Sequence, residues 1–396
     1  ATETVSRMTR NVVLVLSLIF PVMCGMGLNF GIVLGAMAAQ IGYILVTHWN
    51  IDGVIGFMAA GLIATVISVV FGYLVGNLFN RVKGQEMITG MILGYAAGGA
   101  YNIVFIFMVG ALIPMSNPEI MLQVTGSDGE TTYVGLRNTI ELHENTKYAI
   151  DNIWKIDFAA FMLLFAVVCL AIGGIFLVYT MKKYHLSVKE CLNRTRFFLV
   201  AAIAALLVWI LMKLIPAFNN IFFTVRIPVV TVCLIAAFCL LAVYVQRTKL
   251  GQDIRTVGNN MNVATAAGIN VDRVRRSATI LSMVFAAWGQ LIYLQNIGNF
   301  QTYSSHENVG TYAVAALLVG GASLESAKIR QVLTGTALFH ILFFITPLAA
   351  TVVLGDAAYG EYFRVFLCYG IIAVSLALYA LKKNEKGIKI FKIKKK

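Results

Sequence analysis

Residues 247–276 read RTKLGQDIRTVGNNMNVATAAGINVDRVRR. They form the longest polar stretch whose composition is typical of folded structure, in a chain otherwise built from apolar runs. Both ends of this stretch are basic, whereas its centre, Ala-Thr-Ala-Ala-Gly-Ile, is small and apolar. Glycines at 251, 258 and 268 predict short helices joined by tight turns. Basic loops stay on the cytoplasmic side of a membrane, so we expect the stretch to face the cytoplasm. Its small-residue centre offers a flat surface to another protein, and we interpret it as a docking element.

The composition assigns the chain to the membrane proteins. Hydrophobic residues make up 59%, charged residues 12%, and the mean hydropathy is +0.81, whereas a soluble domain has about 25% charged residues. Apolar runs of eighteen or more residues recur, which is typical of transmembrane helices. The net charge of +13 is concentrated in short loops beside these runs and at the C-terminus. This distribution indicates positive-inside topology and argues against a nucleic-acid partner.

The order of apolar runs and basic loops predicts an all-α polytopic protein. About ten crossings fit the runs, with both termini cytoplasmic, in a single membrane domain over residues 1–396. Basic pairs precede the first run (Arg7 and Arg10) and follow the third (Arg81 and Lys83), yet three full crossings cannot begin and end on one side. We therefore expect the Gly/Ala-rich residues 29–49 to be a broken or re-entrant segment inside the bundle. The alternative is an ordinary helix with a small-residue packing face.

The charge pattern also predicts on which side of the membrane two further segments lie. Residues 115–157 contain seven acidic and three basic residues, which suits an extracytoplasmic insert that forms a small hairpin or helix over the mouth. Residues 382–396 are rich in lysine and are expected to form a basic cytoplasmic tail.

The sequence contains none of the common motifs of catalysis or metal binding. It has no GxxxxGK[ST], GxSxG or HExxH pattern and no Cys/His metal spacing. We therefore expect no catalytic residue, no metal site and no cofactor, and the chain cannot by itself cradle nucleotide phosphates. An intramembrane enzyme would need a catalytic pair at membrane depth.

The predicted crossings are almost free of ionisable residues, and His340 is the one central titratable group. This argues against a carrier driven by protons or sodium and favours a polar, uncharged path that takes its energy from outside. The alternative for each polar residue is a hydrogen bond between helices. Mouth candidates are Asn299, Gln301, His306 and Glu307. The candidates for the path itself are Asn29, Gln40, Asn102, Gln290, Gln295, Asn296 and Tyr303.

Two stretches carry a family resemblance: residues 247–291, which extend the opening stretch with SATILSMVFAAWGQL, and residues 309–323, VGTYAVAALLVGGAS. The chain resembles the permease subunits of bacterial ABC importers for branched-chain amino acids, ribose and other simple sugars, and nucleosides. LNFGIVLGAMAAQIG (28–42) is similar to the family more loosely, and NRVKGQEMIT (80–89) is similar to its nucleoside-type branch. The insert at 115–157 is longer than the family pattern, which leaves the substrate class open.

The resemblance implies a transport subunit in the bacterial cytoplasmic membrane that pairs with a second permease copy or paralogue. Two separate ATPase subunits would dock from the cytoplasm, and an extracytoplasmic binding protein would deliver a small polar solute, a nucleoside or a simple sugar. Alternating access would move the solute without chemical change. Carried over to this sequence, the contact with the ATPase falls on Gly258, Asn259, Ala264, Ala267, Gly268 and Ile269. The alternatives are a self-sufficient carrier or channel, and an exporter, which would need no binding protein.

Overall fold

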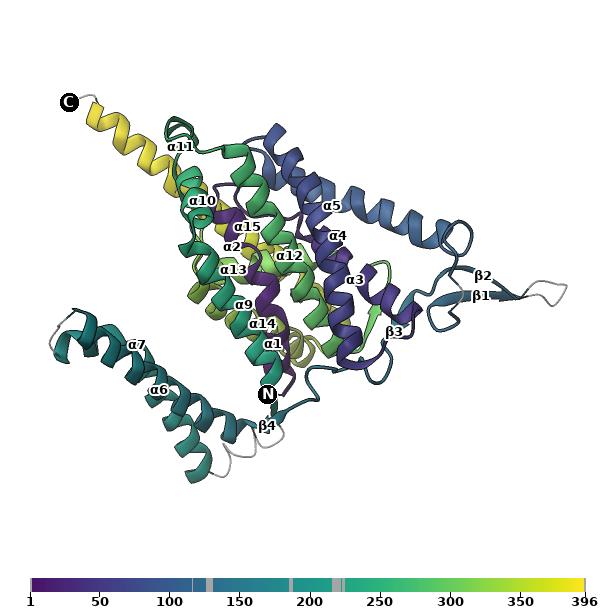
Figure 1. Ribbon diagram of the computed structural model, residues 1–396, viewed down its shortest axis with the longest axis horizontal. Helices are drawn as coiled ribbons and strands as arrows, with labels where there is room; N and C mark the ends of the chain where they lie inside the picture. Colours follow the sequence, from purple (N-terminus) through teal and green to yellow (C-terminus); the bar gives the residue numbers. More distant parts are fainter. Residues whose placement is uncertain are drawn as a thin grey trace. The chain divides into compact units, whose positions relative to one another are not determined.

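The computed structural model describes residues 2–115, 117–125, 131–184, 188–215, 222 and 225–394 (Figure 1). The helices are α1 (Thr2–Leu16), α2 (Ile19–Met23), α3 (Ile32–His48), α4 (Gly53–Arg81), α5 (Glu86–Ile103), a π-helix (Val104–Met108), α6 (Phe158–Tyr184), α7 (Val188–Leu214), α9 (Val229–Arg247), α10 (Lys249–Asn259), α11 (Met261–Ala266), α12 (Val271–Ile297), α13 (Val309–Val319), α14 (Ile329–Leu354) and α15 (Ala357–Lys394).

Within these ranges, eight helices are long and apolar enough to cross a membrane, and three apolar helices are shorter. The prediction of an all-α, multi-pass membrane protein is confirmed.

The chain divides into two compact units. The smaller unit comprises Ala1–Ser6 and Ile150–Val230. Its helices α6 and α7 pack along each other, and the short strands β4 (Lys155–Asp157) and β5 (Arg226–Pro228) pair antiparallel. The rings of Phe158 and Phe222 stack there with their centroids 4.7 Å apart. Most of the basic loop predicted between the two helices, and most of the outer turn at 216–226, lie outside the residues whose side chains are described.

The larger unit, Arg7–Ala149 and Thr231–Lys396, is built around α12. This helix packs mainly against α4 and α3 (Figure 1). Small residues at these contacts let the backbones approach closely. A Cβ added to Gly35 of α3 would lie 2.6 Å from the carbonyl oxygen of Met283, and one added to Gly72 of α4 would lie 2.7 Å from the Cα of Ile280. Hence these glycines set the helix spacing in the core.

The structure corrects the position of the predicted break. The segment expected to be broken or re-entrant, 29–49, contains the continuous 17-residue helix α3, which is almost wholly buried, so the expected break is wrong and re-entry stays a prediction. The irregular backbone lies earlier, between α2 and α3, where Gly25 and Gly27 have φ angles of 74° and 71°. Only glycine adopts this left-handed conformation without strain, so these two residues end the helical path and the Gly/Ala run serves packing.

The predicted insert forms a hairpin tied to the core of the larger unit. Strands β1 (Met121–Thr125) and β2 (Thr131–Leu136) pair antiparallel, and β3 (Thr139–Glu141) pairs with β6 (Asn299–Gln301) directly after α12. The backbone N–H of Tyr148 donates to the carbonyl of Gln295 (2.9 Å), and the Asn117 amide donates to the carbonyl of Thr47 (2.9 Å). The insert thus lies at the C-terminal ends of α12 and α3.

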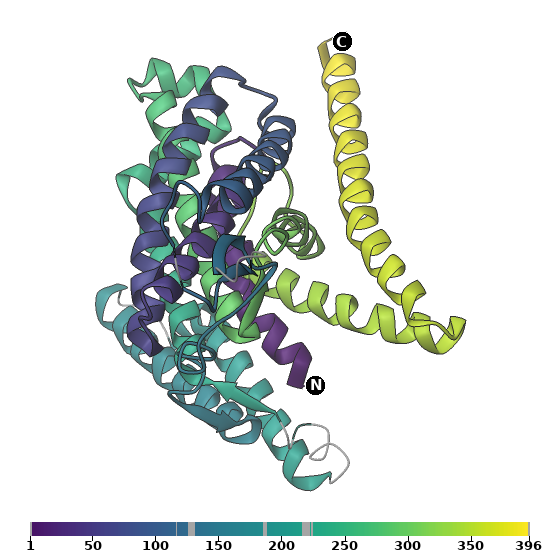
Figure 2. The ribbon, with the colours of Figure 1, turned by 90° about the vertical axis from the view of Figure 1, so that its right-hand side faces the viewer.

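The last two helices meet at Gly355, whose φ of 78° closes a tight left-handed turn. Figure 2 shows α14 and α15 diverging from this turn. Lys395 and Lys396, at the end of the predicted basic tail, lie outside the described residues.

Candidate functional site

The docking element predicted at 247–276 consists of two short capped helices, α10 and α11, at the N-terminal end of α12 (Figure 1). The Thr248 hydroxyl accepts from the backbone N–H of Gly251 (3.4 Å), and the Asn260 side chain accepts from those of Asn262 and Val263 (2.9 and 3.2 Å). Such caps satisfy the free N–H groups of a first helical turn and fix where each helix begins. The prediction of short helices is confirmed.

The glycines of the element do not all form turns. Gly268, with a φ of 78°, closes the turn before α12 as predicted. Gly251 and Gly258 instead lie inside α10, so the turns predicted there are wrong. A Cβ on Gly258 would lie 2.0 Å from the carbonyl oxygen of Met23, and one on Gly251 2.3 Å from that of Val245. Both glycines therefore allow close backbone packing: Gly258 lies against the end of α2, and Gly251 lies against the last turn of α9.

The element has an inward and an outward face. Ile254, Val257 and Ala264 are buried against the larger unit. The outward face, hereafter the docking surface, consists of exposed small or short side chains, among which Val263 is 58% exposed: Asn259, Val263, Ala266, Ala267 and Gly268.

Of the six predicted coupling residues, Asn259, Ala267 and Gly268 are exposed, Gly258 and Ile269 are half-buried, and Ala264 is buried. Their role in coupling stays a prediction. A groove beside α10 is lined by Arg255 and Asn259 together with Lys328 and Arg330. The two loops that the charge pattern placed in the cytoplasm thus lie next to each other.

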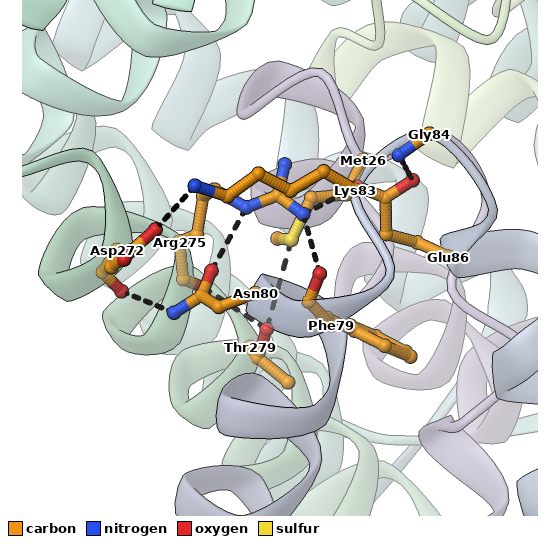
Figure 3. Close-up of polar contacts among 9 residues, drawn as sticks. All are labelled: Met26, Phe79, Asn80, Lys83, Gly84, Glu86, Asp272, Arg275 and Thr279. Atoms are coloured by element: carbon orange, nitrogen blue, oxygen red, sulfur yellow. Dashed lines mark hydrogen bonds and ion pairs between the residues drawn. The ribbon is translucent and has the colours of Figure 1, made fainter.

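A buried ion pair connects the end of this element to α5 (Figure 3). Arg275, on the second turn of α12, is fully buried, and its Nη2 bonds to Oε1 of Glu86, the first residue of α5. The same Nη2 donates to the carbonyl of Phe79 (3.0 Å), and Nε donates to Oδ1 of Asn80 (3.0 Å). Glu86 Oε2 accepts from the backbone N–H of Gly84 (2.9 Å). The pair therefore joins α12 to the turn between α4 and α5.

An exposed layer of polar contacts lies beside this pair. Asn80 also donates through Nδ2 to the backbone carbonyl of Asp272 (2.8 Å), and the Lys83 ammonium lies 2.7 Å from the Asp272 carboxylate. Exposed pairs of this kind contribute at most about 1 kcal/mol, whereas breaking a buried pair costs about 3–5 kcal/mol. Arg275 and Glu86 thus carry most of the connection.

A pocket in the larger unit is the second part of the candidate site. It lies between the start of α3, one side of α5 and the beginning of α13, and its empty space, including the open mouth, is about 550 Å³. The residues that line it are Phe30, Val33, Met91, Gly94, Tyr95, Gly98, Gly99, Asn102, His306, Glu307, Gly310 and Thr311. Two buried polar atoms at this pocket, Oδ1 of Asn102 and Nε2 of His306, have no hydrogen-bond partner among the described residues.

The predicted path residues are spread over several places. Asn102 lines this pocket, and Gln290 lines a second cavity that also contains His340. Gln40 is buried behind the first pocket and contacts His306. Gln295 is buried, and its side-chain amide has no partner among the residues the structure describes.

Three others hold parts of the fold together. Asn29 Oδ1 accepts from the N–H of Gly31 (2.9 Å), Asn296 accepts from Arg10 (3.1 Å), and the Tyr303 hydroxyl donates to the carbonyl of Leu136 (2.7 Å). The seven residues therefore do not line one continuous cavity.

Reasoning from the sequence missed the Arg275–Glu86 pair and gave no special place to His306. A carboxylate two residues beyond Gly84, directly before an apolar helix, was the available signal for Glu86. In the described part of the chain, no three His, Cys, Asp or Glu side chains are grouped as metal ligands.

Comparison with known proteins identifies relatives of one kind. The chain is 34% identical over 128 residues to the nucleoside ABC transporter permease protein NupC of Lactococcus lactis, which covers 32% of this chain and 39% of NupC. It is 28% identical over 167 residues to the galactose/methyl galactoside import permease protein MglC of Salmonella typhimurium (41% and 46%). It is also 28% identical over 148 residues to the autoinducer 2 import system permease protein LsrC of Klebsiella pneumoniae (36% and 41%).

These alignments cover less than half the length of each relative. No family model and no solved structure matches the chain. The resemblance to permease subunits of ABC importers for sugars and nucleosides is confirmed by these relatives.

Proposed function

We propose that this chain is the permease subunit of an ABC importer in the bacterial cytoplasmic membrane. It would form the path for a small polar solute, a nucleoside or a simple sugar, together with a second permease subunit. Separate ATPase subunits would supply the energy, and an extracytoplasmic binding protein would deliver the solute. The observation that carries the proposal is the docking surface: an exposed, capped, small-residue face on an element locked into the core of a chain whose relatives are import permeases.

The docking surface suits a partner that must approach closely. Ala266, Ala267 and Gly268 have almost no side chain to displace, and Val263 adds an exposed apolar contact. The basic residues Arg255 and Arg330 in the adjoining groove would add charge complementarity at its edge. A large charged side chain in the middle of this surface would therefore prevent docking.

A movement of the docking element has a route to the solute pocket. The element is continuous with α12, and Arg275 of α12 binds Glu86 at the first turn of α5. The same helix α5 then lines the pocket with Met91, Gly98 and Asn102. Helices move as stiff bodies when their ends are fixed by buried contacts. We infer that displacement of the element is transmitted through the ion pair to α5 and changes the access to the pocket.

Co-purification tests the proposal. The variant Ala267→Arg places a charge in the middle of the docking surface, whereas Gln123→Arg adds the same charge on the exposed hairpin beyond the other end of α12. Because α12 has 27 residues, it separates the two positions by about 40 Å. We expect the ATPase subunit to co-purify with Gln123→Arg and with the parent chain but not with Ala267→Arg, while all three elute as folded protein. Solute transport by the chain without an ATPase would favour a self-sufficient carrier instead.

A further inference from the structure

The hydrogen bonds behind the pocket fix the proton on one nitrogen of His306. Gln40 donates through Nε2 to the carbonyl oxygen of Gln301 (3.4 Å), and its Oε1 lies 2.7 Å from Nδ1 of His306. The opposite amide orientation would set the oxygen acceptors of Gln40 and Gln301 against each other. Since an amide oxygen only accepts, Nδ1 of His306 carries the hydrogen.

The other nitrogen of this ring is then a bare acceptor directed at the pocket. In a neutral imidazole with its hydrogen on Nδ1, Nε2 has a free lone pair. This atom is buried, has no partner among the described residues, and would lie 3.7 Å from a Cβ on pocket-lining Gly98. The centroid of the Tyr101 ring lies 5.0 Å from the centroid of the imidazole, and this contact limits the rotation of the imidazole. Burial lowers the pKa of His306 to about 4, so the ring stays neutral at physiological pH.

The other polar side chains at the pocket supply a second buried acceptor and a carboxylate, besides the hydroxyls of Tyr95 and Thr311, which can donate or accept. Asn102 Oδ1 is a second buried acceptor without a partner, and the carboxylate of Glu307 lines the same space. A buried acceptor left without a donor is unfavourable, and a bound molecule removes this cost when it supplies the donor. Meanwhile Gly94, Gly98 and Gly310 leave the wall open for a ring to approach the backbone, with Phe30 beside it.

From this arrangement we propose that the pocket binds an uncharged, hydroxylated ring through the hydroxyl hydrogens of that ring, with Nε2 of His306 and Oδ1 of Asn102 as the acceptors. This inference rests on the proposed function, because it identifies the solute of the same transport path. A sugar and the ribose of a nucleoside share this chemistry. Anionic solutes such as sugar phosphates are disfavoured, because Glu307 would repel a phosphate and the described residues that line the pocket include no lysine or arginine to bind it.

Saturation-transfer NMR on the purified full chain, without any ATPase subunit, tests the pocket directly. The probes are ribose, galactose and uridine; uridine is compared with 2′,3′-dideoxyuridine, which lacks the two ring hydroxyls, and ribose is compared with ribose 5-phosphate, which carries charge. We expect a signal from at least one hydroxylated probe, and none from the dideoxy compound or the phosphate. Equal signals from uridine and its dideoxy form, or no signal from any hydroxylated probe, would overturn the proposal.

Matched variants assign the acceptors. Asn102→Asp keeps an oxygen acceptor and Asn102→Leu removes it; His306→Gln can place an oxygen near Nε2, whereas His306→Phe removes the acceptor. We expect binding to weaken about three- to tenfold in Asn102→Leu and in His306→Phe, which is the usual effect of one lost hydrogen bond. Binding should be retained at least in part in Asn102→Asp and His306→Gln. Unchanged affinity in both Asn102→Leu and His306→Phe contradicts the assignment.

Two further variants separate a blocked pocket from a misfolded protein as the cause of lost binding. Gly174→Leu in α6 is the control, because Gly174 is exposed, lies outside the pocket lining and has nothing within 4 Å of an added Cβ, so this variant should bind like the parent chain. Gly98→Leu should fill the pocket and abolish the signal while the elution profile of the protein is unchanged. Binding that persists in Gly98→Leu shows that the probe sits elsewhere. The binding experiment contains no ATPase. A failure to bind the probes therefore does not affect the co-purification result, and a failure of the ATPase to co-purify does not affect the binding result.

Discussion

Arg275 of α12 and Glu86 of α5 form an ion pair 189 residues apart in sequence and shielded from solvent, with Arg275 fully buried and Glu86 5% exposed. Taking two charges out of water costs several kcal/mol per ion, which is recovered only when every donor and acceptor finds a good partner. The pair itself and contacts with Phe79, Asn80 and Gly84 provide most of this compensation, whereas Nη1 of Arg275 is buried without a hydrogen-bond partner among the described residues. Such a pair stabilises one fixed relation between two helices, which is what a transmission element requires.

Removing one member of the pair should destabilise the chain strongly. Glu86→Gln or Arg275→Met leaves an uncompensated buried group, so we expect a loss of about 3–5 kcal/mol, measured as a lower midpoint of thermal unfolding in detergent. Lys83→Ala removes only the exposed contact with Asp272 and should cost at most about 1 kcal/mol. Equal effects of the two kinds of variant would contradict the central place of the buried pair.

The double variant Arg275→Met/Glu86→Leu separates stability from transmission. Replacing both charges by apolar side chains is often neutral or stabilising, so the double variant should be more stable than either single one. If the pair transmits movement, solute uptake by the assembled importer should nevertheless remain low, with ATP hydrolysis retained. Restored stability together with full uptake would show that the pair is structural only.

The close packing of α10 on the end of α2 makes a second stability prediction. Gly258→Ala forces a methyl group to within 2.0 Å of the Met23 carbonyl oxygen, a backbone atom that cannot move aside. We expect a loss of about 1–3 kcal/mol, as for other overpacked sites. Gly174→Ala in α6 meets nothing within 4 Å and serves as the matched control, which should be neutral or slightly stabilising because alanine favours helix. The comparison uses unfolding midpoints in one detergent.

A pH dependence follows from the buried imidazole. The pKa of His306 is lowered from 6.5 to about 4 by burial, so between these values the unfolded chain binds a proton that the folded chain does not. Stability from this group is therefore complete above pH 6.5 and is lost as the pH falls towards 4. Unfolding midpoints measured across this window should fall more steeply for the parent chain than for His306→Gln. Parallel curves would contradict the assigned protonation state.

The sequence was sufficient for the class of fold and for the short helices at 247–276, because apolar runs and a basic, small-residue interval are local features. Gly251 and Gly258 show its limit: a glycine in a turn and a glycine under a crossing backbone look alike until the neighbour, here Met23 or Val245, is known. For the same reason the Gly/Ala run of α3 was expected to be broken although it packs as a continuous helix.

Long-range contacts were beyond the reach of the sequence. The Arg275–Glu86 pair depends on two helices meeting, and the pocket depends on three distant segments that bring Phe30, Asn102 and His306 together. The proton on His306 can be placed only once Gln40 is seen between it and Gln301.

Photo-crosslinking from the docking surface shows whether the ATPase subunit binds there in the assembled complex. A benzophenone side chain placed at Ala267 in the assembled complex should, on illumination, form a covalent adduct that contains the ATPase subunit, and the same group at Gln123 should not. An adduct with the ATPase from position 123, or none from position 267 in a complex that still hydrolyses ATP, would show that the ATPase does not bind at this surface.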